Sequence, residues 1–309
     1  MEIMKRALIL ILLLNSCSHR SAVRLVLQPR STNNYPSYFA SWLGFYKEEG
    51  LDVEISTVAG ASKVLEAVVG GSADVGGGVY EQTLDMAEQG KSIVAFISLL
   101  KSPNFAIIGA KNVHNFADLR GKSVGVTSAG SPSQFYLNYF LKKEGVNPSE
   151  VGIASIGVNA TAIAALEYHQ VDAAVMFGTA VSEYLLRHPD AAVLADTRTP
   201  AGLQAAFHVD NYPASCLLAD RKWLETNPDT AKRMARAVRK ALTWLRTHSA
   251  EEVLAKVPDL GDREAELEAI RLAQPMYSED GLIDKENAQV VASVRRSKVD
   301  VSGTFLNLN

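Results

Sequence analysis

One pattern of residues occurs twice in this chain, and it constrains the fold more than any other feature. The segment FYKEEGL at 45–51 is matched by FLKKEGV at 140–146. Each copy precedes an extended stretch, a helical stretch and then an Asp among small and apolar residues, Asp74 in the first and Asp172 in the second. Two similar α/β units predict two similar lobes, and the cleft between two lobes is a common place for a small-molecule site.

The composition fits a folded protein with two domains. The chain has 309 residues, of which 47% are hydrophobic and 21% are charged, so each domain could bury a core of its own. The formal net charge of −3 does not favour a polyanionic partner, and no basic run is interleaved with aromatic residues. We therefore expect no nucleic-acid ligand.

The first 17 residues have the pattern of a secretory signal. A basic start at Lys5 precedes an unbroken apolar run at 7–14, which is too short for a helix to span the roughly 30 Å core of a bilayer. The run leads into LNSC at 14–17, which resembles a bacterial lipoprotein signal, although Asn15 departs from the usual small or branched residue. Lipidation of Cys17 and a membrane anchor are favoured over simple cleavage.

The cysteines and histidines indicate neither a disulfide framework nor a structural zinc site. If Cys17 carries lipid, Cys216 stays free, and an isolated Cys in the apolar segment ASCLL at 214–218 is typical of a core residue. The six His residues show no metal-ligand spacing. We expect no metal and no cofactor.

Strands and helices alternate along most of the chain, which predicts an α/β protein with mostly parallel sheets flanked by helices. Strands are expected near 23–27, 52–58, 74–78 and 93–100, and again near 123–127, up to 156, and at 173–177. After a further strand at 215–219 the pattern changes to long helices at 229–248, 250–256, 264–273 and 285–296.

The order of these elements predicts two lobes that are discontinuous in sequence. The first lobe is expected to comprise residues 23–108 and to be completed by the helical tail at 208–309. The second lobe, residues 109–207, would be an insertion. Two strands near 105–110 and 205–215 would join the lobes as a hinge.

Several motifs together resemble the SsuA/THI5-like (NMT1-like) solute-binding proteins of bacterial ABC importers. These are EGLDV at 49–53, ADVG at 73–76 and DLRGK at 118–122, and the similarity runs from about residue 23 to 306. The resemblance implies the type II periplasmic-binding-protein fold, with a small organic solute captured between closing lobes. Sulfonates, pyrimidines or thiamine precursors, and aromatic acids are the solute classes it suggests.

The same resemblance implies the partners and the location. The solute would be delivered to an ABC permease with its ATPase, and the protein would act as a monomer in the periplasm or cell envelope. Enzymes of the same fold, a pyrimidine-precursor synthase or a menaquinone-pathway lyase, are the alternative. The chain has no Cys cluster, nucleophile elbow or P-loop, and its secretory signal also disfavours an enzyme.

Ligands of open α/β sheets bind beyond the carboxyl ends of the strands, so the strand-to-helix loops form the candidate site. In the first lobe the candidate ligand-binding residues are Asn34, Tyr35, Pro36, Gly60, Gly78, Val79, Tyr80 and Glu81. In the second lobe they are Ser128, Gly130, Ser131, Asn159, Phe177 and Gly178. No catalytic residue is expected.

The loop SAGSP at 128–132 is the strongest of these candidates. Ser131 is expected to cap a helix that begins at Pro132, with Gln134 completing a capping box. This geometry would leave backbone N–H groups from Gly130 onward pointing outward, where a carboxylate, sulfonate or phosphate can bind. An ordinary capped helix is the structural alternative.

The remaining loops allow both functional and structural interpretations. The glycines at 76–78 could form a tight turn or let a flat ligand approach, with Tyr80 as a stacking face and Glu81 as an acceptor. Asn159 could recognise an amide or ring edge, or cap a helix, and Phe177 could cover a ring or fill the core.

Positive charge is scarce in the candidate loops. Arg30 is the one Arg or Lys that falls within them, although Arg198 could also reach the cleft. A multiply charged anion would be poorly compensated there. We therefore expect a neutral or singly charged solute that is partly aromatic or apolar.

Overall fold

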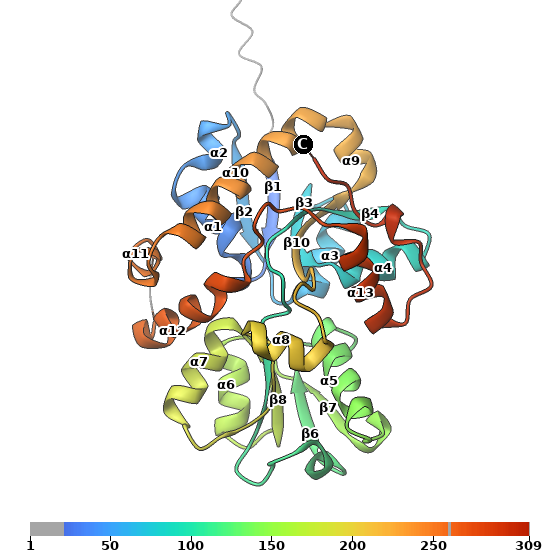
Figure 1. The fold of residues 1–309 in the computed structure, drawn as a ribbon, viewed down its shortest axis with the longest axis vertical. Coiled ribbons are helices and arrows are strands. Elements are labelled where there is room, and N and C mark those ends of the chain that lie inside the picture. Colours follow the sequence, from blue (N-terminus) through green and yellow to red (C-terminus); the bar gives the residue numbers. More distant parts are fainter. Residues whose placement is uncertain (1–21, 259–260, 309) are drawn as a thin grey trace, which may run out of the picture.

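The structure, a computed structural model, describes residues 22–258 and 261–308 (Figure 1). The described residues form two lobes, each built on a five-stranded sheet with helices packed around it. The signal and the lipidated Cys17 predicted within the first 17 residues lie outside the described residues. Within the described part of the chain, no helix is both long and apolar enough to cross a membrane.

The sheet of the first lobe has the strand order β2-β1-β3-β10-β4. β1 pairs in parallel with β2 and β3, whereas β10 runs antiparallel to both β3 and β4. The strands are β1 (Val23–Leu27), β2 (Val53–Thr57), β3 (Val75–Val79), β4 (Ile93–Ser98) and β10 (Ser215–Asp220).

The sheet of the second lobe repeats this arrangement in the order β7-β6-β8-β5-β9. β6 pairs in parallel with β7 and β8, and β5 runs antiparallel to β8 and β9. The strands are β5 (Phe105–Gly109), β6 (Ser123–Val126), β7 (Gly152–Ser155), β8 (Ala173–Phe177) and β9 (Ala192–Asp196). The predicted two-lobe α/β fold is confirmed, but each sheet is mixed rather than mostly parallel, because the strand that arrives from the other lobe runs against its neighbours.

Helices cover both sheets, and the C-terminal ones lie in the first lobe. The first lobe carries α1 (Tyr35–Trp42), α2 (Phe45–Glu48), α3 (Ala61–Val69), α4 (Glu81–Glu88), α9 (Arg221–Thr226), α10 (Pro228–Thr247), α11 (Ala250–Leu254), α12 (Arg263–Ala273) and α13 (Lys285–Arg295). The second carries α5 (Pro132–Lys143), α6 (Ala160–Glu167), α7 (Gly178–Arg187) and α8 (Pro200–Phe207).

The long helix α10 packs against the first helices of the chain. The ring of Trp244 lies 5.4 Å from that of Phe39 on α1. Arg236 and Lys240 form ion pairs with Glu49, just after α2, at 2.8 and 2.9 Å. Apolar packing across widely separated parts of the sequence therefore completes the first lobe.

The two repeated segments end their helices in the same way. Gly50 and Gly145 both adopt left-handed backbone conformations, with φ of 67° and 72°. The N–H of the next residue, Leu51 or Val146, donates to the carbonyl five positions earlier at 2.9 and 2.8 Å. This is the Schellman motif, which explains why both copies place Gly before an apolar residue.

The chain passes between the lobes twice, through the connection 99–104 between β4 and β5 and through the connection 197–214 between β9 and β10, which includes α8. The crossing segments contact each other: Ser102 Oγ donates to the Thr197 carbonyl at 2.5 Å, and the Tyr212 N–H donates to the Lys101 carbonyl at 2.8 Å. The two connections between the lobes therefore form one hydrogen-bonded unit.

Candidate functional site

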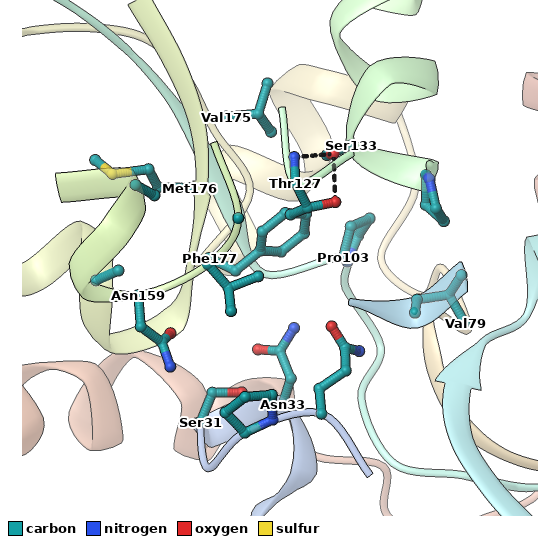
Figure 2. Close-up of a pocket in the computed structure, with 18 of the residues that line it drawn as sticks. Ser31, Asn33, Val79, Pro103, Thr127, Ser133, Asn159, Val175, Met176 and Phe177 are labelled. Atoms are coloured by element: carbon teal, nitrogen blue, oxygen red, sulfur yellow. Dashed lines mark hydrogen bonds between the residues drawn. The ribbon is translucent and has the colours of Figure 1, made fainter. Parts of the chain in front are cut away.

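A cavity lies between the lobes, at the carboxyl ends of their parallel strands (Figure 2). It contains about 760 Å³ of empty space, counting the part open to solvent. Gln28, directly after β1, and Val79, at the end of β3, contribute to its first-lobe wall. Thr127, directly after β6, and Phe177, at the end of β8, occupy the equivalent positions in the second lobe. The two halves of the repeat therefore supply matching parts of one cavity.

Three carboxamide side chains line this cavity with hydrogen-bonding capacity left over. Within the described chain, the side chains of Gln28 and Asn159 have no hydrogen-bond partner. Asn33 accepts from Asn104 Nδ2 at 2.5 Å through Oδ1, which leaves its own NH₂ group available. Asn33 and Asn159 point toward the cavity from opposite lobes in Figure 2. Each amide can donate and accept, so together they suit a solute with several polar edges.

A pair of hydroxyl groups forms another polar part of the wall. The Thr127 N–H donates to Ser133 Oγ at 2.9 Å, and Thr127 Oγ1 lies 3.0 Å from the same oxygen (Figure 2). Hydroxyl hydrogens can rotate to suit a ligand, so this pair can donate or accept at its free positions.

Most of the rest of the wall is apolar or aromatic. Phe177 and Tyr136 both line the cavity, and the Tyr136 ring stacks on Phe105 at 4.6 Å with an interplanar angle of 16°. Further apolar contributions come from Pro29, Ala61, Val79, Pro103, Pro132, Val158, Ala162, Val175, Met176 and Ala180. Such surfaces favour a ligand with a flat or apolar part.

No Asp, Glu, Lys, Arg, His or Cys is among the described residues that line the cavity. Arg198, considered above as a cleft residue, is only 7% exposed and forms a two-pronged pair with Asp196, with Nε–Oδ1 and Nη2–Oδ2 distances of 3.0 and 2.6 Å. Arg30 donates to the Pro258 carbonyl. Nowhere in the described parts do three or more His, Cys, Asp or Glu residues gather in a way that could hold a metal ion.

Three of the predicted site residues, Val79, Asn159 and Phe177, line the cavity. The others lie outside its wall: Asn34, Tyr35, Pro36, Gly60, Gly78, Tyr80, Glu81, Ser128, Gly130, Ser131 and Gly178. Several of these belong to the packed interior, since each is at most 3% exposed: Asn34, Tyr35, Tyr80, Glu81 and Ser131.

Tyr80 and Glu81 are the clearest examples of this difference. Tyr80 is completely buried, and its hydroxyl lies 2.5 Å from Thr304 Oγ1 on the C-terminal segment, so it is not a stacking face in the cleft. Burial raises the pKa of its phenol. Glu81 is also buried, and it accepts hydrogen bonds from two tyrosines that are described below.

The glycines at 76–78 form most of β3 rather than a turn. A Cβ atom at Gly76 would lie 2.7 Å from Val64, and one at Gly77 would lie 2.5 Å from Leu27. At Gly78 it would lie 2.5 Å from Leu218. These glycines therefore allow neighbouring side chains to pack directly on the strand.

The predicted capping box at Ser131 is wrong, although Ser131 does precede the first helical residue, Pro132. The Ser131 hydroxyl makes no cap hydrogen bond, since it bonds to the hydroxyls of Thr127 and Ser133 at 3.0 and 2.7 Å. Gln134 Oε1 instead accepts from the Gly130 N–H at 2.7 Å. That N–H, expected to point outward toward an anion, is therefore already engaged.

Sequence reasoning missed several lining residues that lie very close to those it selected. Gln28 and Thr127 are each the first residue after a strand, and Ser133 is the second residue of α5. Ser31, Asn33 and Tyr136 were missed as well. The rule that ligands bind beyond strand ends points to the right loops, and applying it to the first position after each strand would have found Gln28 and Thr127.

Comparison with known proteins identifies relatives over most of the chain. The family model described as NMT1/THI5 like matches residues 31–252. The putative binding protein YtlA of Bacillus subtilis (strain 168) is 25% identical over 272 residues, which cover 84% of this chain and 78% of that protein. The 4-amino-5-hydroxymethyl-2-methylpyrimidine phosphate synthase THI11 of Saccharomyces cerevisiae is 23% identical over 227 residues, 68% of this chain and 62% of that protein.

Solved structures share the two-lobe fold. A protein from Bordetella bronchiseptica RB50 is similar with a TM-score of 0.87 and 32% identity, over 93% of this chain and 95% of that one. The alkanesulfonate-binding protein SsuA from Xanthomonas axonopodis pv. citri, solved bound to MOPS, gives a TM-score of 0.74 at 16% identity, over 93% and 98% of the two chains. The architecture is therefore that of the periplasmic binding proteins.

Proposed function

The chain belongs to the NMT1/THI5-like family, and from that premise we propose that it is the extracytoplasmic solute-binding component of an ABC importer. The observation that most supports this function is the cavity between the lobes, whose walls come from equivalent loops of both. A solute held by both lobes stabilises their closed arrangement, and separation of the lobes at the permease releases it.

The chemistry of the wall supports a small organic solute that is neutral or carries a single charge. Gln28, Asn33 and Asn159 offer amide groups, while Phe177 and Tyr136 offer aromatic surfaces. With no charged side chain among the described lining residues, a multiply charged anion would lose its hydration without compensation. Among the solute classes considered above, the aromatic part of the wall favours pyrimidines and aromatic acids, because both offer a flat ring.

A synthase is the second candidate, and the similarity to the yeast enzyme favours it. The cavity offers little support for catalysis, because neither His, Cys, Lys nor a carboxylate is among its described lining residues. Those are the side chains that most often act as general acids, bases or nucleophiles. We therefore propose a binding protein rather than an enzyme.

Identification of the solute tests this proposal. Native mass spectrometry of the full-length protein, followed by a thermal-shift panel of pyrimidines, aromatic acids and sulfonates, should reveal a compound that raises the melting temperature, because binding stabilises the folded state. The bound compound should be recovered unchanged. Its conversion to another compound by the purified protein would instead establish an enzyme.

Variants of one lobe check that this compound binds in the cavity. Phe177→Leu keeps an apolar side chain but removes the ring, so it should weaken binding. Leu186→Ala changes an exposed residue of α7 in the same lobe and should leave the affinity unchanged. Equal affinities of the two variants would place the solute elsewhere.

The cellular location is a separate part of the proposal. We propose that the N-terminal signal exports the protein and that Cys17 is lipidated, which anchors it to a membrane. Incorporation of radioactive palmitate into the wild type, with loss of both label and membrane association in Cys17→Ala, is the expected result. Unlabelled protein that stays soluble would contradict lipidation without affecting solute binding.

A further inference from the structure

Glu81 connects the two lobes through one carboxylate oxygen. It is the first residue of α4 in the first lobe and is only 1% exposed. Its Oε1 accepts hydrogen bonds from the Tyr136 hydroxyl at 2.5 Å and from the Tyr212 hydroxyl at 2.8 Å. Tyr136 lies on α5 of the second lobe, whereas Tyr212 lies in the crossing segment 197–214.

The two tyrosines differ in which lobe they would follow during opening. The crossing segment near Tyr212 is tied to the first lobe, because the Tyr80 N–H donates to the Ala214 carbonyl at 2.8 Å. Tyr136 instead stacks on Phe105 of β5, inside the second lobe. The Tyr212 ring also stacks on Phe207 of α8, with the ring centroids 4.8 Å apart, so its ring contacts the second lobe while its backbone is held by the first. We expect separation of the lobes to break the bond from Tyr136 to Glu81 and to keep the bond from Tyr212, because of this backbone contact.

Tyr136 also links this contact to the cavity. Its ring is part of the cavity wall, while its hydroxyl reaches across to the first lobe. A hydrogen bond to a carboxyl group in a buried setting favours the arrangement in which it forms, because leaving the buried group without its partner is costly. The bond to Glu81 therefore influences the position of Tyr136 in the cavity wall.

A second buried carboxyl group bridges the lobes elsewhere. Glu266, on α12 of the first lobe, is 7% exposed and accepts from Thr179 Oγ1, on α7 of the second lobe, at 3.3 Å. It also accepts from the Tyr35 hydroxyl within its own lobe. Glu81 and Glu266 thus each accept one hydrogen bond from a hydroxyl of the second lobe and one from a hydroxyl outside that lobe.

We propose that Glu81 is a positioning residue for solute capture, which acts through Tyr136 to hold the lobes together and so sets how much of the solute-free protein is closed. This role of Glu81 rests on the proposed solute-binding function, but the hydrogen bond between Tyr136 and Glu81 can be tested without any solute. Failure to find a solute and failure of this contact are therefore distinguishable results.

The surroundings of Glu81 predict how closure depends on pH. Burial raises the pKa of Glu81, against the effect of the Tyr136 and Tyr212 hydroxyls, and Oε2 has no partner within the described residues. The other ionisable groups that face it are Tyr80, Cys216 on β10 and Arg295 on α13, which pairs with Asp85. The closed form has the Tyr136 bond, which lowers the pKa of Glu81, and the open form lacks it, so the two forms bind the proton with different affinity and closure should depend on pH.

Small-angle X-ray scattering of the solute-free, full-length protein measures closure directly. Tyr136→Phe should increase the radius of gyration, because it removes the bond between lobes but keeps the ring. Tyr212→Phe is the matched control, because it removes the other hydrogen bond to Glu81 Oε1. We do not expect this loss to separate the lobes, so the radius of gyration should equal that of the wild type. Equal radii in all three proteins, or equal opening in both variants, would overturn the proposal.

A pH series provides a readout that a purely structural role would not change. The radius of gyration of the wild type should change between about pH 8 and about pH 5, since protonation of Glu81 alters its bond to Tyr136. Glu81→Gln keeps the shape of the side chain but cannot titrate, so its pH response should be smaller, with Glu266 left to contribute. A pH response unchanged in Glu81→Gln would overturn the role assigned to Glu81.

Discussion

Asp74 and Asp172 make the same hydrogen bond in the two lobes. Asp74 Oδ2 accepts the backbone N–H of Arg24 on β1, and Asp172 Oδ2 accepts the backbone N–H of Ser123 on β6, each at 2.9 Å. In return the N–H groups of the two Asp residues donate to the carbonyls of Arg24 and Ser123 at 2.9 and 2.8 Å. Each Asp therefore fixes the start of the third strand of its unit to the start of the first.

Removing these carboxylates should affect the two lobes unequally. Asp74 also forms a close ion pair with the Arg24 side chain at 2.6 Å, whereas Asp172 lies 3.6 Å from Lys122 Nζ. We expect Asp74→Ala to lower the free energy of unfolding by about 1–3 kcal/mol and Asp172→Ala to lower it by less. Urea unfolding of both variants measures the difference, and a larger loss for Asp172→Ala would contradict the expectation.

Acid should remove the contribution of Asp74. Burial works to raise the pKa of Asp74, but the hydrogen bonds from the side chain and backbone of Arg24 outweigh it and hold the pKa below its usual value. A group whose pKa is lowered on folding stabilises the protein above its unfolded pKa, about 4, and this stabilisation is lost as the pH falls through the folded pKa. Below about pH 4, stability should therefore fall more steeply in the wild type than in Asp74→Asn.

Substitution of Asn159 by Gly should raise the stability of the protein and weaken solute binding. It adopts φ 54° and ψ −126° at the start of α6, a conformation that is unfavourable for a residue with a side chain. Gly60 takes the equivalent place before α3 with φ 87°. Asn159→Gly should relieve the strain and stabilise the protein by about 1 kcal/mol, while loss of the amide weakens solute binding.

Thermal unfolding and solute titration of the same protein samples measure both effects. Gly60→Ala is the reciprocal variant, and it should destabilise the first lobe by about 1–3 kcal/mol because its φ is positive. If Asn159→Gly were less stable than the wild type and bound the solute equally well, Asn159 would have a structural role instead.

Gly77→Ala should destabilise the fold without a direct effect on the cavity. The added methyl group would lie 2.5 Å from Leu27, inside the packed sheet of the first lobe. Overpacking of this kind costs about 1–3 kcal/mol. Gly303→Ala is the matched control, because nothing lies within 4 Å of the Cβ position there, and it should unfold at nearly the wild-type denaturant concentration.

The repeat in the sequence predicted the two lobes because its residues have local backbone roles. Gly50 and Gly145 end helices, and Asp74 and Asp172 fix strand starts, so their spacing reports the structure directly. The mixed sheets were harder to predict, since the direction of β10 depends on a chain that has already passed through the other lobe. Such long-range pairing leaves no local pattern in the sequence.

The candidate site was predicted at the level of loops but not of side chains. Strand ends identify which loops border the cleft, whereas the direction of each side chain depends on packing. Tyr80 and Glu81 look suited to ligand binding in the sequence, yet Thr304 and Tyr212 hold them in the interior from positions far along the chain. Gln28 is the opposite case. Nothing in the sequence distinguishes this polar residue, and it lines the cavity because it directly follows β1.

Titration calorimetry with the identified solute tests the central claim, that both lobes bind one solute between them. Asn33→Ala in the first lobe and Asn159→Ala in the second should each weaken binding by roughly threefold to tenfold, the effect of losing one hydrogen bond. Asn138→Ala, an amide of α5 outside the cavity wall, should bind as the wild type does. Unchanged affinity in either Asn33→Ala or Asn159→Ala would contradict capture of the solute between the lobes.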